Sequence, residues 1–294
     1  MKRNAGTFRG TRPIAVTPNR RPPIQWPHAK RVAFYVGVAL EHYLLDKPST
    51  SIFAGTALLK PDPLNYGWRD YGMRVGIWRM IDSLDRHGMR ATAFLNSEVC
   101  ARYPAIIEAG CQRGWAWIAH GRDNSTFQSF ATRQEEVTYL REVVNTIESR
   151  TGSRPRGWVG PALTETFETP SILAELGLDY VLEWCADDQP FHLNIPGMLS
   201  VPYSIELNDV TLFANRNLSG ADFLQIIKDQ YDQLSADSVQ SGRVMGLGLH
   251  PFVVNQPFRH KYLDRALEYI ASQPDVWLTT ADDIAAHFKV SHPR

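Results

Sequence analysis

The 294-residue chain is poor in cysteine and has no long apolar run. Its three cysteines, Cys100, Cys111 and Cys185, form no CxxC pair and no spacing that indicates a disulfide framework. We therefore expect a reducing location, the cytoplasm. No stretch of about 18 apolar residues is present, so we expect no membrane-spanning helix. The N-terminus shows no apolar core followed by a cleavage site, so a signal peptide is not indicated.

The chain also lacks an excess of charge and several common catalytic motifs. Lys plus Arg and Asp plus Glu number 31 each, so the formal net charge is zero. This balance indicates neither a nucleic acid nor an anionic membrane as a partner. There is no GxGxxG and no GxxxxGK(S/T), which argues against binding of a dinucleotide or a nucleoside triphosphate. There is no GxSxG elbow and no cysteine framed as a nucleophile, so covalent serine or cysteine catalysis is not indicated.

Strand-like and helix-like patterns alternate along the chain, which is typical of βαβ units and predicts an α/β fold with a parallel sheet. We expect one domain over residues 31–294, after a proline-rich arm at residues 1–30. The arm is expected to pack on the body or on a neighbouring subunit of a homo-oligomer. Strands are expected at 31–41, 91–95, 115–119, 157–159, 180–184, 244–249 and 276–279, with extended pieces at 199–207 and 210–214; helices are expected at 73–87, 97–113, 132–151, 170–176, 223–234, 262–270 and 282–288; residues 44–70 are expected to form a long loop.

Polar side chains gather where the expected strands end. Glu41 and His42 follow the first strand, His120 and Asn124 follow the third, and His250 follows a late one. In a parallel barrel the carboxyl ends of the strands share one face, so we expect these side chains to meet there. Carboxylates and imidazoles can supply a general base, a general acid and ligands for a divalent metal. Hydrolysis with water as the nucleophile is the simplest chemistry that fits.

Each of these residues also has an ordinary structural interpretation. A histidine at a strand end is often a buried residue without a chemical role, and asparagine or aspartate in a turn, such as Asn124 or Asp188, is common. Adjacent strand residues point to opposite faces, so Glu41 and His42 face the same side only if the strand ends before His42.

Four segments carry a specific resemblance: Leu40-Glu41-His42, His120-Gly121-Arg122-Asp123-Asn124, the run from Arg154-Pro155 to Pro161, and Leu247-Gly248-Leu249-His250. Their order, over roughly residues 31–288, resembles the polysaccharide deacetylase family, the NodB-homology hydrolases. The resemblance implies a distorted (β/α) barrel with fewer than eight full units and hydrolysis of an acetamide.

Two positions depart from the family's pattern. Members carry two adjacent aspartates where this chain has Glu41-His42, and a second histidine where this chain has Asn124. Asparagine offers only a neutral carbonyl oxygen, a poor ligand for a zinc-like ion. The variation resembles a cytosolic branch that includes the allantoinase of the urate pathway and cyclic-imide hydrolases, which cleave a ring amide in place of an acetamide.

The sequence therefore predicts a hydrolase of a non-peptide carbon–nitrogen bond, acting on a cyclic amide or an N-acetyl group of a small molecule or carbohydrate. The alternative is an inactive relative that only binds such a molecule. The expected cofactor is none or one divalent metal ion. The candidate catalytic residues are Glu41, His120 and His250; the candidate substrate-binding residues are Arg69, Trp158, Trp184 and Asp188; the candidate metal ligands are Glu41, His42, His120 and Asn124.

Overall fold

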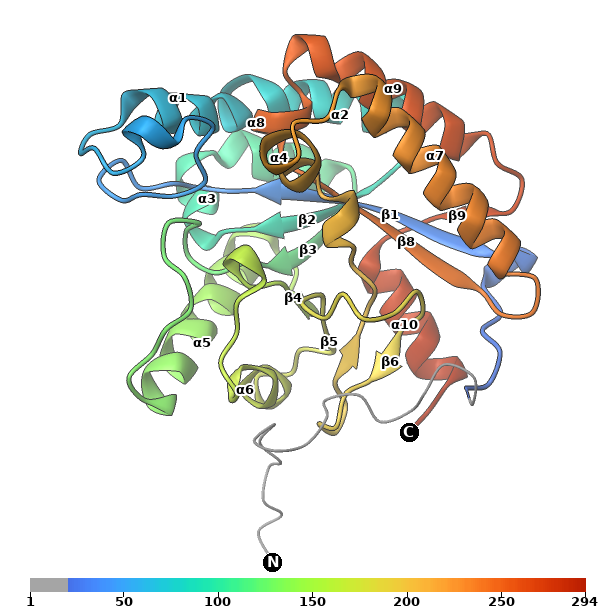
Figure 1. Ribbon diagram of the computed structural model, residues 1–294. Helices are drawn as coiled ribbons and strands as arrows, with labels where there is room; N and C mark the ends of the chain where they lie inside the picture. Colours follow the sequence, from blue (N-terminus) through green and yellow to red (C-terminus); the bar gives the residue numbers. More distant parts are fainter. Residues whose placement is uncertain (1–20) are drawn as a thin grey trace, which may run out of the picture.

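The computed structural model describes residues 21–294 of the chain. Its centre is a nine-stranded sheet with the order β6-β7-β5-β4-β3-β2-β1-β8, and β9 also pairs with β1. These pairs are parallel except for β6 with β7. The sheet curls, with helices around it (Figure 1), which confirms the expected α/β fold of the distorted (β/α) barrel type. The strands are β1 (Val32–Leu40), β2 (Ala91–Leu95), β3 (Ala116–Ala119), β4 (Gly157–Trp158), β5 (Tyr180–Val181), β6 (Phe191–His192), β7 (Leu199–Ser200), β8 (Arg243–Leu249) and β9 (Val276–Leu278).

Helices cover the outer side of the sheet. Figure 1 shows α2, α7 and α9 above β1 and β8, α5 and α6 at the lower left, and α10 near β6. The α-helices are α1 (Pro63–Tyr71), α2 (Ile77–Arg86), α3 (Ser97–Arg102), α4 (Pro104–Gln112), α5 (Arg133–Thr151), α6 (Thr169–Glu175), α7 (Gly220–Asp237), α8 (Pro251–Val254), α9 (Pro257–Ala271) and α10 (Ala281–Ser291).

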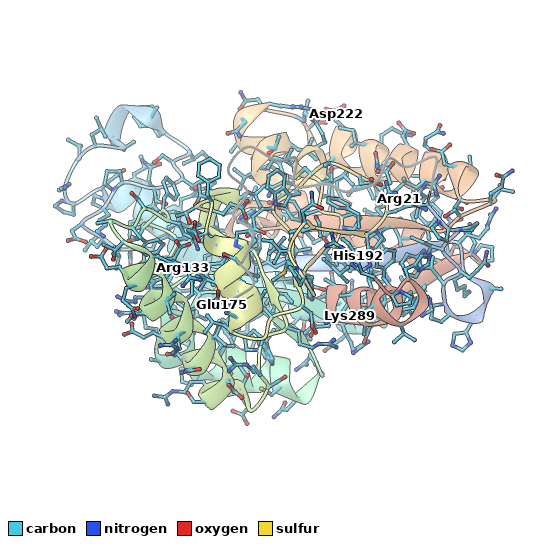
Figure 2. All side chains as sticks on the ribbon, turned by 90° about the horizontal axis from the view of Figure 1, so that it is seen from below. Arg21, Arg133, Glu175, His192, Asp222 and Lys289 are labelled. Atoms are coloured by element: carbon cyan, nitrogen blue, oxygen red, sulfur yellow. The ribbon has the colours of Figure 1, made fainter. Side chains whose placement is uncertain are left out.

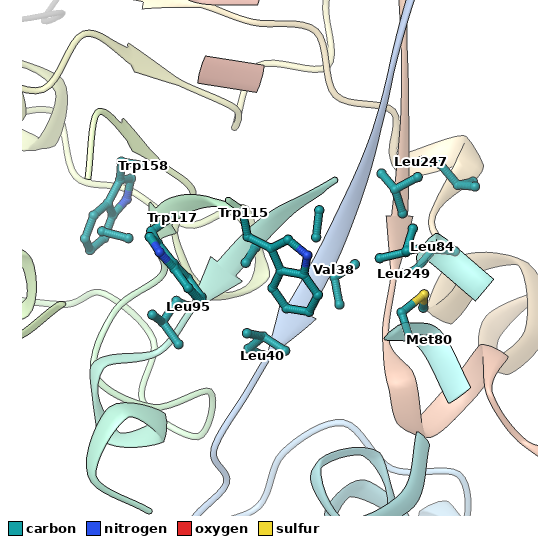
Figure 3. Packing of buried hydrophobic residues seen from close by; sticks show 14 of the residues in the cluster. Val38, Leu40, Met80, Leu84, Leu95, Trp115, Trp117, Trp158, Leu247 and Leu249 are labelled. Carbon is teal, nitrogen blue, oxygen red and sulfur yellow. The ribbon is translucent and has the colours of Figure 1, made fainter. Parts of the chain in front are cut away.

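Strand β1 lies inside the sheet, and all nine of its residues are buried. A near-continuous apolar run is what a parallel strand with both faces covered requires. Its side chains alternate between the two faces. Val38 shares a hydrophobic cluster with Met80 and Leu84 of α2 (Figure 3), whereas Tyr35 belongs to a second cluster that contains Phe94. This alternation decides which side chains reach the inner face at the end of the strand.

Two expected segments have a different local structure. The loop expected at 44–70 contains α1, which begins at Pro63 after Asp62, whose side chain accepts a hydrogen bond from the Asn65 N–H. A proline at the first helical position and an aspartate N-cap start a helix without a clear apolar period. The extended piece expected at 210–214 is instead a π-helical segment, Val210–Asn215. Its apolar run does not distinguish a short strand from a buried helical turn.

The described end of the proline-rich arm packs on the body of its own chain. Ile24 and Trp26 are buried, and Trp26 Nε1 donates a hydrogen bond of 2.9 Å to the carbonyl of Arg243. Arg21 pairs with Asp187. Residues 1–20 of the arm lie outside the described residues, so the expected contact of the arm with a second subunit stays a prediction. No helix within residues 21–294 is long and apolar enough to cross a membrane.

Exposed ion pairs link the outer helices. Arg133 and Glu175, labelled in Figure 2, join α5 to α6 at 2.7 Å. Pairs that are this exposed contribute at most about 1 kcal/mol each to stability. The fold therefore depends mainly on the two hydrophobic clusters of the sheet.

Candidate active site

The ends of three strands bring Glu41, His120 and His250 together. Glu41 follows β1, His120 follows β3 and His250 follows β8. His120 Nε2 lies 3.3 Å and His250 Nε2 lies 3.6 Å from Glu41 Oε1. The Glu41 side chain is only 3% exposed. One carboxylate oxygen is therefore shared by two imidazole rings from distant parts of the chain.

The second oxygen of Glu41 is held by a tyrosine that the sequence did not single out. Tyr43 donates its hydroxyl proton to Glu41 Oε2 and accepts a hydrogen bond of 3.2 Å from Asn124 Nδ2. The Asn124 Oδ1 atom is buried and has no hydrogen-bond partner within the described part of the chain. A buried acceptor without a partner costs free energy unless a ligand or water supplies a donor. Asn124 thus offers an acceptor beside the shared carboxylate.

His250 is held by Asp209, which the sequence pattern also did not single out. Asp209 Oδ1 lies 2.7 Å from His250 Nδ1, and Asp209 Oδ2 accepts the His250 backbone N–H at 2.8 Å. Nδ1 must carry a proton because it faces a carboxylate. Asp209 comes immediately before the π-helical segment, where no sequence pattern marks a strand end.

The two carboxylates decide the charge of the site. Burial alone would lower the pKa of His250, but the negative charges of Glu41 and Asp209 raise it to about 10. Burial alone would raise the pKa of Glu41, but the charge on His250 and hydrogen bonds from both histidines hold it well below the usual range. At neutral pH the site therefore contains an ionised Glu41 and an imidazolium at His250 with a proton on Nε2.

The tautomer of His120 is set by the backbone. Its Nδ1 lies 2.6 Å from the carbonyl oxygen of Val159, which can only accept a hydrogen bond. Nδ1 therefore carries a proton, and Nε2 is directed toward Glu41 Oε1 at 3.3 Å.

A cavity of about 230 Å³ opens on these groups. Phe94, Tyr203 and Leu163 give it an apolar wall, and Asn208 is among its polar lining residues. Among the described residues that line it, none is a lysine or an arginine. His250 also lines the cavity, and its charge is already paired with Glu41 and Asp209.

The four candidate substrate-binding residues do not line this cavity, which corrects the expectation from sequence. Trp158 is fully buried in the cluster that faces the helices, because β4 is short and the next residue, Val159, takes the inner face. Trp184 also packs against that cluster. Asp188 lines a separate cavity of about 220 Å³.

Arg69 does not line the cavity of about 230 Å³ and lies instead next to Tyr43. Its guanidinium stacks on the Tyr43 ring at 4.9 Å, and its Nη1 donates to the Thr50 carbonyl at 2.6 Å. Arg69 therefore packs against the tyrosine that holds Glu41.

The residues present do not fit a divalent metal. Within residues 21–294, no three His, Cys, Asp or Glu side chains form a group that could hold an ion. His42, expected as a ligand, has a ring 6.5 Å from that of Tyr103 and does not line the main cavity. Glu41 and His42 both follow the end of β1 at Leu40, where the His42 N–H donates to Asn96 Oδ1 at 3.0 Å. The His42 ring lies beside Tyr103, whereas Glu41 lines the cavity. Asn124 supplies only a neutral oxygen.

Known proteins are similar to this chain in both sequence and fold. Residues 68–181 match the family model for polysaccharide deacetylase. A Schizosaccharomyces pombe protein described as a polysaccharide deacetylase is 26% identical to it over 247 residues, which are 76% of each chain.

Two solved structures are similar to this chain in fold over almost its whole length. A Puue allantoinase has a TM-score of 0.84 at 25% identity, covering 94% of this chain and 96% of that one. A Pseudomonas aeruginosa PAO1 protein described as a polysaccharide deacetylase has a TM-score of 0.83 at 24% identity, covering 94% and 97%. The resemblance inferred from the four sequence segments is confirmed. The matched range of the family model includes His120 and Asn124, and the geometry adds Glu41 and His250.

Proposed function

We propose that this protein hydrolyses an amide carbon–nitrogen bond of a small uncharged molecule, with Glu41, His120 and His250 as catalytic residues. The observation that carries the proposal is the approach of both imidazoles to one carboxylate oxygen, beside the unpartnered carbonyl oxygen of Asn124. A base, an acid and a water-orienting acceptor within hydrogen-bond reach of one position are what such a hydrolysis needs.

The residues divide the proton transfers between them. A water molecule donates hydrogen bonds to Glu41 and to Asn124 Oδ1, which directs its oxygen at the substrate carbonyl carbon. As the carbon–oxygen bond forms, the water becomes more acidic and Glu41 takes its proton. The carbon–nitrogen bond then breaks while His250 gives its Nε2 proton to the leaving nitrogen. The products are a carboxylic acid and an amine, which stay in one molecule if the substrate is a ring.

The substrate is proposed to be either a cyclic amide or an N-acetyl group. The name of the S. pombe relative points to an N-acetylated carbohydrate, and that of the solved allantoinase points to a ring amide. The cavity of about 230 Å³ has room for one ring, and no lysine or arginine is among its described lining residues.

Parallel turnover assays test the proposal. The purified protein is incubated with cyclic ureides and imides, followed by ring opening, and with N-acetylated sugars, followed by acetate release. Turnover of one class supports the proposed function and names the substrate. Binding of either class without turnover would instead support the alternative, an inactive relative that only binds such a molecule. The alternative is motivated by Glu41-His42 in place of two aspartates and by Asn124 in place of a second histidine.

Activity is expected to depend weakly or not at all on added metal. Glu41, His120 and His250 contact one another, and a fourth strong ligand is replaced by Asn124. The measurement is hydrolysis before and after dialysis against a strong chelator, and again after addition of zinc, manganese or cobalt. Activity that disappears on dialysis and returns with one ion would contradict this prediction.

The protein is also proposed to be a cytoplasmic homo-oligomer in which the proline-rich arm at residues 1–30 contacts a neighbouring subunit. Deletion of residues 1–20 should lower the mass measured by light scattering and leave the monomer folded, because Ile24 and Trp26 stay in place on their own chain. A full-length chain that is already monomeric at assay concentration would rule the proposal out.

A further inference from the structure

One peptide group next to the candidate active site is hydrogen-bonded at both ends. The carbonyl of Val159 accepts the Nδ1 proton of His120 at 2.6 Å. The N–H of the same peptide unit, on Gly160, donates to Glu183 Oε1 at 2.6 Å. A continuous chain of hydrogen bonds therefore runs from Glu183 through the Val159–Gly160 peptide to His120.

Glu183 is itself held in place. Glu183 lies just after β5, and the Val159–Gly160 peptide lies just after β4, the strand with which β5 pairs. Its Oε2 atom accepts the Leu182 N–H at 3.0 Å, so both carboxyl oxygens are bound by backbone donors. Burial and the neighbouring Glu165 raise the pKa of Glu183 well above the usual range. No other role for this half-buried acid follows from the cavity, because Glu183 is not among its described lining residues.

We propose that Glu183 is a positioning residue for His120 and acts through the Val159–Gly160 peptide. An acceptor on the peptide N–H polarises the peptide and makes its carbonyl oxygen a stronger acceptor, because hydrogen bonds in a chain strengthen one another. The stronger carbonyl keeps the proton of His120 on Nδ1 and the ring oriented. Nε2 then stays directed at Glu41. This step rests on the proposed catalytic role of His120.

A purely structural role for Glu183 makes a different prediction. Gly160, Ala162 and Leu163 line the cavity, and Ala162 and Leu163 both have positive φ angles, 54° and 56°. Such backbone needs support, so a residue that only anchors this loop would change stability and substrate binding. It would leave the hydrogen bond of His120 unchanged.

The test compares Glu183→Gln with the control Glu136→Gln. Glu136 is buried in α5. It accepts a hydrogen bond of 2.7 Å from Thr166, which lies in the loop that follows β4, and it does not bond to the 159–160 peptide. In the ¹⁵N-labelled protein without substrate, Glu183→Gln should move the His120 Nδ1 proton and the Gly160 amide proton upfield. It should also lower kcat by about tenfold with little change in KM, as loss of an outer partner of a functional histidine does. The control should move neither resonance.

Unchanged His120 and Gly160 resonances in Glu183→Gln would overturn the proposal. If that variant does not fold, Glu183→Asp keeps the carboxyl group on a shorter side chain and should shift both resonances in the same direction by less. In the wild-type protein, a His120 Nδ1 proton without the downfield position of a strong hydrogen bond would also overturn it. The resonances are measured without substrate, so a protein that shows the shifts but no turnover would contradict the proposed function alone.

Discussion

Replacement of Glu41 by glutamine is expected to abolish most of the activity while leaving the fold intact. The amide cannot take a proton from water, and positioned acid–base groups contribute about 10²–10⁴-fold to rate, so kcat/KM should fall by about 1,000-fold. The change also removes a negative charge that lies 3.6 Å from His250. The pKa of His250 should therefore move down from about 10 toward its ordinary value.

The measurements for Glu41→Gln are kcat/KM on the substrate identified by the screen and an NMR titration of His250. The matched control is Glu175→Gln, because Glu175 is an exposed glutamate that pairs with Arg133 far from the cavity. Activity near that of the control would show that Glu41 is not the base, and a His250 pKa that does not move would show that the two groups are not coupled.

Replacement of Asp209 by asparagine is the second change with a large expected effect. The amide is isosteric with the carboxyl group, but it has no charge to stabilise the imidazolium, and its NH₂ group can face Nδ1 and favour the wrong tautomer. We expect kcat to fall by about 10²–10⁴-fold. The alkaline limb of the kcat/KM profile, which reports loss of the His250 proton, should move to lower pH from about 10. Asp229→Asn, at an exposed position of α7, is the control.

The same variant should change how stability depends on pH. The pKa of His250 is higher in the folded protein, about 10 against 6.5, so its stabilisation is fully present below pH 6.5 and is lost as the pH rises through about 10. Asp209→Asn should reduce this loss, which urea unfolding at a series of pH values measures. An unchanged pH dependence in both kinetics and unfolding would mean that Asp209 does not control the protonation of His250.

The pattern of apolar runs was enough to predict the fold class and where chemistry would gather. The run from Val32 to Leu40 is buried along its whole length, as a central parallel strand must be, and the sequence marks its end by Glu41. Because parallel strands share their carboxyl ends, the order of residues alone was enough to place His120 and His250 with Glu41.

The partners of these residues could not be predicted from the sequence. Asp209 lies 41 positions from His250, on a π-helical segment whose apolar pattern resembles a strand. Glu183 reaches His120 only through the backbone of another strand. Contacts of this kind depend on how distant segments pack, and local periodicity carries no information about that packing.

By itself, the sequence therefore determined the alternating α/β order, the strand ends and the three residues proposed for catalysis, because these depend on local hydrophobic period and on topology. Only the tertiary structure decided which face each side chain takes. It directed Glu41 to the inner face and His42 away from it, and it buried Trp158 among the helices. It also placed Asp209 against His250 and left the Asn124 carbonyl oxygen without a partner among the described residues. These outcomes follow from long-range packing and from the alternation of side chains at the rim of the sheet. If a strand ends one residue earlier or later, the next side chain points to the opposite face.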